Sequence, residues 1–129
     1  MAVLLSAPVA VDPHRDFLVP RHEAVTTVNH DSSLTDGQAD DLVGWAAAAE
    51  NLVVRTPAAT AEGAAIKMLV LLQMTAVGHE VSEEMAWPVV EEAAGLLGMP
   101  KLVDMGYLAP EDQRAREAAA DAVRMEAQA

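Results

Sequence analysis

Acidic side chains are the residues of this sequence best suited to chemistry, because paired carboxylates can act as a general acid and a general base. Four pairs are adjacent in the chain: Asp40-Asp41, Glu83-Glu84, Glu91-Glu92 and Glu111-Asp112. Adjacent residues of a helix point about 100° apart and therefore do not face one site. The sequence also has no glycine-rich phosphate loop and no Gly-x-Ser-x-Gly nucleophile turn. We therefore predict a protein that is not an enzyme, with no catalytic residues and no cofactor.

The overall charge is strongly acidic, with 20 acidic and 8 basic residues and a formal net charge of −12. This charge repels nucleic acids and anionic membrane surfaces, and it attracts a partner protein with a basic surface. Glu84 and Glu91, seven residues apart, share one helix face. The predicted partner-binding residues are Glu80, Glu83, Glu84, Glu91 and Glu92. The alternative interpretation is a solvated acidic stripe that only keeps the protein soluble.

Histidines are the other residue type that could bind a metal. His14, His22 and His30 recur every eight residues near several carboxylates. This interval matches neither the i, i+4 pair of a helical zinc site nor the closer ligand spacings of zinc loops. We therefore predict no metal site.

Cysteine usage and hydropathy indicate the compartment. The chain has no cysteine, and no apolar run approaches the roughly 20 residues that span a bilayer. The apolar N-terminus lacks the basic start of a signal peptide. These features predict a soluble, cytoplasmic protein.

Helices are expected to position these side chains, because the sequence is 52% hydrophobic but only 3% aromatic and is rich in alanine. We predict an all-α domain over residues 34–129, with about four helices in an antiparallel bundle. Helices are expected over about 35–54, 61–77, 82–97 and 110–126, with a short turn within 101–108. Ser33 or Thr35, Thr60 and Ser82 are the predicted N-caps, and Pro88 is expected to kink or divide the third helix.

Residues 1–33 differ from the rest of the chain. They contain Pro8, Pro13 and Pro20 among short apolar pieces, without a sustained helical period. We predict a proline-containing N-terminal arm, extended and with room for one short turn or strand. Its apolar residues Phe17, Leu18 and Val19 are expected to wrap onto the core or onto a partner subunit.

The helix predicted over residues 61–77 is apolar around most of its circumference. Such a helix must be covered on more than one side, by other helices or by a second copy of the chain. We therefore predict a homodimer, and the predicted self-association residues are Leu69, Val70, Leu72 and Met74.

Residues 56–68, TPAATAEGAAIKM, follow a tryptophan-bearing helix and carry a further pattern. They resemble the Pro-Ala-Thr-Thr-x-x-Gly-x-Ala-x-Lys segment of small uncharacterised helical proteins from alphaproteobacteria and their phages. The matching residues are Pro57, Ala58, Thr60, Gly63, Ala65 and Lys67, whereas Ala59 stands where the segment has the first of its two threonines. The resemblance implies a helical hairpin and an accessory or mobile-element context.

Two classes of function remain open at this point. The first is a non-enzymatic interaction module that docks its acidic face on a basic protein. A specific form is a phage-type inhibitor, such as an anti-CRISPR protein that occupies a basic nucleic-acid-binding groove. The second is a small-molecule binder or enzyme with a pocket between helices, whose walls would include Trp45, His79, Trp87 and Tyr107.

Overall fold

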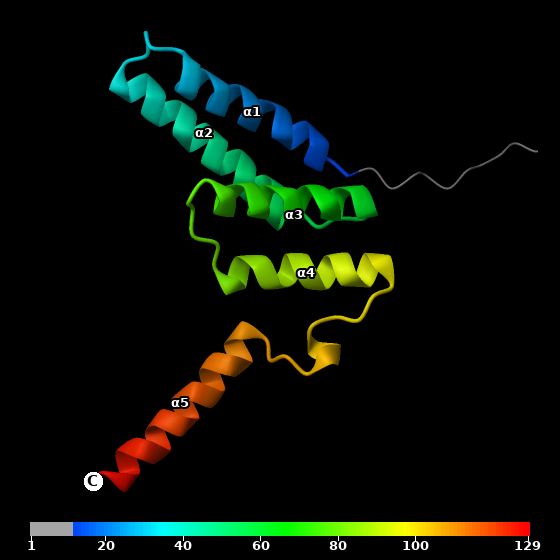
Figure 1. Ribbon diagram of the computed structural model, residues 1–129, viewed down its shortest axis with the longest axis vertical. Coiled ribbons are helices and arrows are strands. Elements are labelled where there is room, and N and C mark those ends of the chain that lie inside the picture. The colour runs from blue at the N-terminus through cyan, green and yellow to red at the C-terminus, as the bar shows by residue number, and fades with distance from the viewer. Residues whose placement is uncertain (1–11) are drawn as a thin grey trace, which may run out of the picture.

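The computed structural model describes residues 12–129, and this range contains helices and loops but no β-strand (Figure 1). The α-helices are α1 (His14–His30), α2 (Asp36–Arg55), α3 (Ala61–Ala76), α4 (Glu83–Leu97) and α5 (Pro110–Ala127). A 3₁₀ turn, η1 (Val103–Met105), lies between α4 and α5. The predicted all-α fold is confirmed, and the described range has five α-helices in place of about four.

Three helices begin at the predicted residues because a side-chain oxygen caps each first turn. The Thr35 hydroxyl accepts from the Gln38 backbone N–H at 3.2 Å, and the Gln38 side chain accepts from the Thr35 backbone N–H at 3.0 Å. Thr60 caps α3 and Ser82 caps α4 by the same kind of bond. Helix α4 ends at Gly98, whose φ of 64° lies in the left-handed region that favours glycine.

Helix α1 corrects the prediction of an extended arm. Most of residues 14–30 were expected to be extended, but they form a continuous helix with Pro20 inside it. Phe17 and Leu18 pack against the core and Ala24 is buried, so apolar burial offsets the backbone hydrogen bond that proline cannot donate. Val19 does not pack on the core as expected, because it lies on the outer side of α1 and is 55% exposed. The remainder of the predicted arm, residues 1–11, lies outside the described residues.

Arg21 is a charged residue at a position of α1 where the helical pattern would have an apolar one. It lies four residues after Phe17 and three before Ala24, on the face that packs against the other helices. Its guanidinium donates to Glu50 at 3.0 Å and to the Gln73 side chain at 2.7 Å. The side chain is only 16% exposed, so a charged residue occupies an inward position because its donors find partners on α2 and α3.

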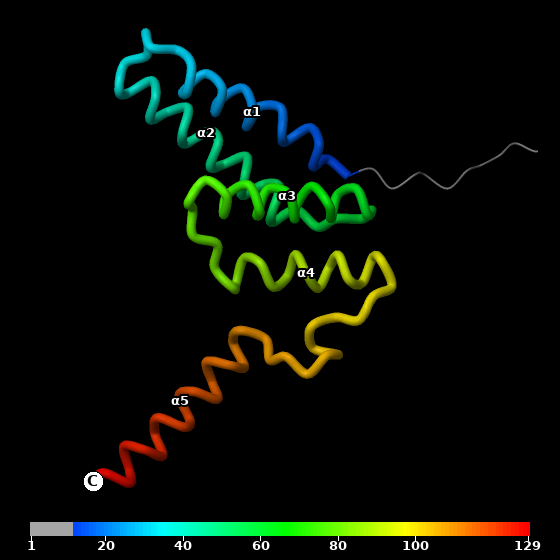
Figure 2. The backbone as a smooth tube through the Cα atoms, viewed as in Figure 1, coloured from blue at the N-terminus to red at the C-terminus, as the bar shows by residue number. Residues whose placement is uncertain are grey.

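The helices pair as two antiparallel hairpins, α1 with α2 and α3 with α4 (Figures 1 and 2). The core lies where α2, α3 and α4 meet, and its buried members are Val53, Val54, Ile66, Val70, Leu71 and Val89. Helix α5 contacts α4 through its first half and then leads away from the other helices (Figure 1). The arrangement therefore differs from the predicted antiparallel bundle in that α5 is not packed among the other helices.

Helix α4 is not divided at Pro88. The helix continues from Glu83 to Leu97, and both Val89 and Ala93 are buried beyond the proline. Proline at this point removes one donor, but the apolar face that follows is held against the core. Within residues 12–129, no helix is both long enough and apolar enough to cross a membrane.

Candidate functional site

The tightest polar cluster joins the start of α1 to the α2–α3 connection. Asp12 accepts from the backbone N–H of Ala59 at 2.8 Å and of Thr60 at 2.9 Å, and also from the Thr60 hydroxyl. His14 Nε2 donates to the Thr56 carbonyl oxygen at 2.8 Å. Gly63 completes the cluster, because a Cβ at this position would lie 2.6 Å from Asp12 Cγ. We call these five residues Asp12, His14, Thr56, Thr60 and Gly63 the Asp12 clasp.

The Asp12 clasp connects two distant segments of the chain, and its side chains are largely covered. The side chain of His14 is fully buried and that of Asp12 is 7% exposed. Hydrogen bonds from the Thr60 hydroxyl and from the Ala59 and Thr60 backbone hold the pKa of Asp12 below its ordinary value of 3.8. Thr60 and Gly63 belong to the segment that carries the family resemblance, and their observed role is to hold α1 against α3.

The predicted acidic face does not form one free surface. Glu92 binds the Lys67 ammonium at 2.6 Å, and Glu91 accepts from the Leu102 backbone N–H at 2.6 Å. Glu84 forms an ion pair with Arg114 of α5. These three carboxylates therefore hold parts of the chain together, because each has an internal partner.

Glu80 and Glu83 are the members of the predicted set that remain free. Both are exposed, and neither forms an ion pair or a side-chain hydrogen bond within residues 12–129. Both lie near the start of α4, at the connection from α3. The acidic surface available to a partner is thus narrower than the sequence predicts.

An apolar groove of about 570 Å³ lies between the α1–α2 hairpin and the end of α3. Val43 and Val77 on its walls are 55% and 71% exposed. The apolar groove is defined by Ala24, Val25, Val28, Leu42, Val43, Ala46, Ala47, Val54, Met74, Val77 and Met85. His79 and the paired side chains of Arg21 and Glu50 add polar groups to its lining.

Exposed carboxylates lie beside this groove. Asp40 precedes Val43 by three residues and Ala47 by seven, so it shares their face of α2. Glu80 directly follows His79, which lines the groove. Asp40 and Glu80 are exposed and have no ion-pair partner in the described chain. The apolar groove therefore has two unpaired carboxylates on residues that neighbour its lining in the chain or on the same helix face.

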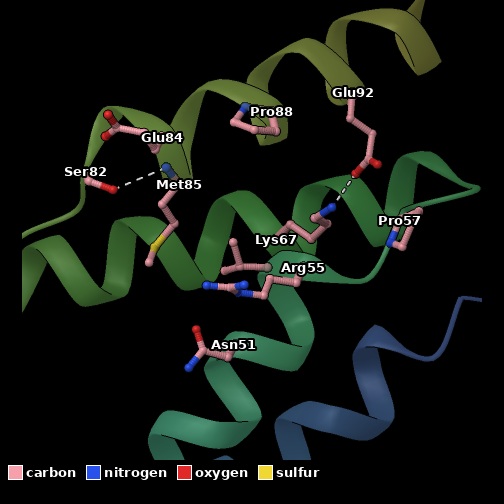
Figure 3. A pocket seen from close by; sticks show the side chains of 10 residues that line it. Asn51, Arg55, Pro57, Lys67, Ser82, Glu84, Met85, Pro88 and Glu92 are labelled. Atoms are coloured by element: carbon pink, nitrogen blue, oxygen red, sulfur yellow. Dashed lines mark hydrogen bonds and ion pairs between the residues drawn. The ribbon is translucent and has the colours of Figure 1, made fainter. Parts of the chain in front are cut away.

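A more polar pocket of about 500 Å³ lies where α2, α3 and α4 meet (Figure 3). Its lining residues are Asn51, Val54, Arg55, Pro57, Lys67, Ser82, Glu84, Met85, Pro88 and Glu92. The Lys67 side chain is 5% exposed and is directed at Glu92 (Figure 3). Sequence reasoning missed this pair because its members are 25 residues apart on different helices, with no local spacing to indicate it.

The predicted self-association residues fall into two groups. Leu69 and Leu72 are 47% and 67% exposed, so they are available to a second copy of the chain. Val70 is fully buried in the core, and Met74 packs against the core from its edge. The prediction is therefore wrong for Val70, which α2 and α4 already cover.

The residues predicted to wall a pocket between helices do not meet. Trp45 is 68% exposed on α2, and His79 lies at the apolar groove. Trp87 and Tyr107 line a separate hollow between α4, η1 and α5. Across residues 12–129, no group of three or more histidine and carboxylate side chains is placed to hold a metal ion.

No protein-family model, curated protein or solved structure matches this chain.

Proposed function

We propose that this chain is a non-enzymatic protein-interaction module that binds a basic amphipathic helix of a partner protein in the apolar groove. The observation that carries the proposal is the combination of that groove with exposed carboxylates beside it. A helix laid into an apolar groove is a recurrent mode of peptide recognition, and charge on the flanks selects the partner.

The apolar walls supply the reason for binding. Val25, Val43 and Val77 are 40%, 55% and 71% exposed, and all three line one groove. Removing such side chains from water contributes about 25 cal/mol for each Å² of apolar surface buried. A helix with leucines on one face would cover these residues.

The carboxylates near the groove favour a partner with a positively charged surface. Asp40 and Glu80 have no internal partner, and the whole chain has a net charge of −12. Lysine or arginine side chains beside the apolar face of the incoming helix would meet these carboxylates. Of the predicted partner-binding residues, we assign this role to Glu80. Glu83 lines the separate hollow between α4 and the start of α5, and Glu84, Glu91 and Glu92 have partners within the chain.

A phage-type inhibitor is the specific form of this function that we propose. The strong negative charge and the resemblance of residues 56–68 support it. In this form the acidic chain would inhibit a nucleic-acid-binding protein in the manner of an anti-CRISPR protein. The target would supply the basic helix that lies in the apolar groove.

The proposal is tested by fluorescence anisotropy with a synthetic helical peptide of about 18 residues that carries leucines on one face and lysines on the other. Val43→Ser and Val77→Ser should each weaken binding roughly tenfold, because each removes an apolar contact. Asp40→Asn and Glu80→Gln should weaken it less, and their effect should disappear at high salt.

Two controls and a second peptide make the test specific. Leu52→Ser on α2 and Asp112→Asn on α5 alter exposed residues outside the groove, and both should bind like the wild type. A peptide with the same leucines but glutamates in place of lysines should not bind. Equal binding of the two peptides, or wild-type affinity in the groove variants, would overturn the proposal.

We also propose self-association through the exposed side of α3. Ala65, Leu69, Leu72 and Ala76 are exposed on one face, at intervals of four, three and four residues. This spacing reads the same in both directions, so two antiparallel α3 helices would place each leucine opposite a leucine, as a two-fold interface requires. Light scattering should give a dimer for the wild type and a monomer for Leu72→Glu, and a monomeric wild type would contradict the proposal.

A further inference from the structure

The polar pocket between α2, α3 and α4 contains a positive charge that the protein itself does not neutralise. Five basic side chains in the described chain, including Lys67, form ion pairs with carboxylates. Arg55, on the pocket wall, has no carboxylate within the 4.0 Å of an ion pair in residues 12–129. The chain has 20 acidic residues, and yet none of those described pairs with this arginine. An arginine that lines a pocket without a carboxylate partner is a candidate anion-binding group.

Lys67 provides a second group in this pocket that can donate hydrogen bonds to an anion. Lys67 is 5% exposed, and its single hydrogen-bond partner in the described chain is Glu92 Oε1 at 2.6 Å. An ammonium has three N–H donors, so two of them have no protein acceptor. Arg55 and Lys67 come from different helices, and both line the same pocket (Figure 3).

The balance of charge in the pocket limits the ligand to one negative charge. Glu92 neutralises Lys67, and Glu84 is paired with Arg114, so Arg55 leaves about one positive charge. A phosphate dianion would exceed this charge and would be repelled by Glu92. A carboxylate matches it, and the planar guanidinium of arginine binds a carboxylate through two parallel hydrogen bonds.

We propose that this pocket binds a small amphipathic carboxylic acid, with its carboxylate on Arg55 and Lys67. The apolar part of the ligand lies against Val54, Met85 and Pro88, which line the same pocket. This inference does not depend on partner binding in the apolar groove, although Asn51, Val54 and Met85 line both hollows.

The test is an NMR titration of the full ¹⁵N-labelled chain with sodium hexanoate. Saturable shifts are expected for amides around the pocket, and Arg55→Gln should weaken the affinity roughly tenfold or more by removing a charge-assisted hydrogen bond. Arg55 is exposed, so this variant should keep the wild-type spectrum. Arg55→Lys retains the charge but cannot form two parallel hydrogen bonds to a carboxylate. Its affinity for hexanoate should therefore lie between those of the wild type and Arg55→Gln.

Matched controls decide between specific and general binding. Arg116→Gln removes an exposed, unpaired arginine of α5 and should leave hexanoate binding unchanged. 1-Hexanol, which has the apolar body without the charge, should not give saturable shifts at the pocket. Inorganic phosphate at about pH 8, where it is mainly a dianion, should not give them either. No saturable hexanoate shift, an unchanged affinity in Arg55→Gln, or equally tight binding of 1-hexanol or phosphate would overturn the inference.

Discussion

The two ends of the described chain are attached to the core by different kinds of contact. At the N-terminal end, the Asp12 clasp joins residues 47 and 48 positions apart through hydrogen bonds to the Asp12 carboxylate, whose side chain is 7% exposed. At the C-terminal end, every residue of α5 after Pro110 is exposed, and the Arg114–Glu84 ion pair that ties it to α4 is 59% and 51% exposed.

This difference predicts how stability is distributed. Hydrogen bonds to a carboxylate contribute more than neutral ones, and breaking those of Asp12 would leave a mostly covered side chain without its partners. An exposed ion pair contributes about 0–1 kcal/mol, because water and salt screen it. The N-terminal end should therefore unfold together with the core, whereas α5 should open locally.

Gly63→Ala should have the largest effect. The new Cβ would lie 2.6 Å from Asp12 Cγ, and the Asp12 carboxylate is fixed by its hydrogen bonds, so it cannot move away without breaking them. We expect the free energy of unfolding to fall by about 2 kcal/mol. Urea denaturation monitored by circular dichroism measures this change.

Gly44→Ala on α2 is the matched control. Nothing lies within 4 Å of a Cβ built at Gly44, and the residue is exposed within a helix. We expect this variant to be more stable by about 0.5–1 kcal/mol. Equal effects of the two substitutions would show that the Asp12 clasp does not constrain Gly63.

The local start signals were predictable from the sequence because each acts within one helical turn. Thr35, Thr60 and Ser82 each bond to a backbone N–H three residues later, so their neighbours in the sequence are sufficient to identify them. The same holds for the stop at Gly98, where a left-handed residue ends α4. The positions of four helices could therefore be predicted closely.

Features that depend on distant contacts could not be predicted. Helix α1 was missed because Pro20 and Arg21 interrupt its pattern, and the partners of Arg21 lie 29 and 52 residues away. The burial of Val70 could not be predicted, because α3 is apolar on most sides and its sequence does not show which side the other helices cover. The apolar groove combines α1, α2 and α3, and no single segment indicates it.

Acid should weaken the N-terminal attachment. Hydrogen bonds lower the pKa of Asp12 below 3.8, so the folded state binds this proton less readily than the unfolded chain does. The resulting stabilisation is fully present above about pH 4 and is lost as the pH falls through the folded-state pKa. Urea denaturation from pH 6 down to about pH 2 should show this loss, and Asp12→Asn should reduce the slope.

Asp31 provides the comparison for this measurement. Its pKa is also lowered, by hydrogen bonds from the Ser33 side chain and backbone, but these bonds are local and exposed. Asp31→Asn should therefore leave the Asp12 contribution in place. An identical pH profile for the wild type and Asp12→Asn would show that the Asp12 clasp is not coupled to folding.

Removal of α5 should have the smallest effect. A chain that ends after Pro110 keeps the buried proline and loses only exposed residues and the Arg114–Glu84 pair. We expect the free energy of unfolding of the remaining helices to change by less than about 1 kcal/mol. Urea denaturation of the truncated chain measures this change, and a loss of cooperative unfolding would contradict it.

The most direct test of the central claim is an NMR titration of the ¹⁵N-labelled chain with the leucine–lysine peptide. The largest shifts should occur at Val25, Val43 and Val77, which line the apolar groove, while the amides of α5 stay unchanged. Shifts concentrated in α5, with the groove amides unaffected, would contradict the claim that this groove is the binding site.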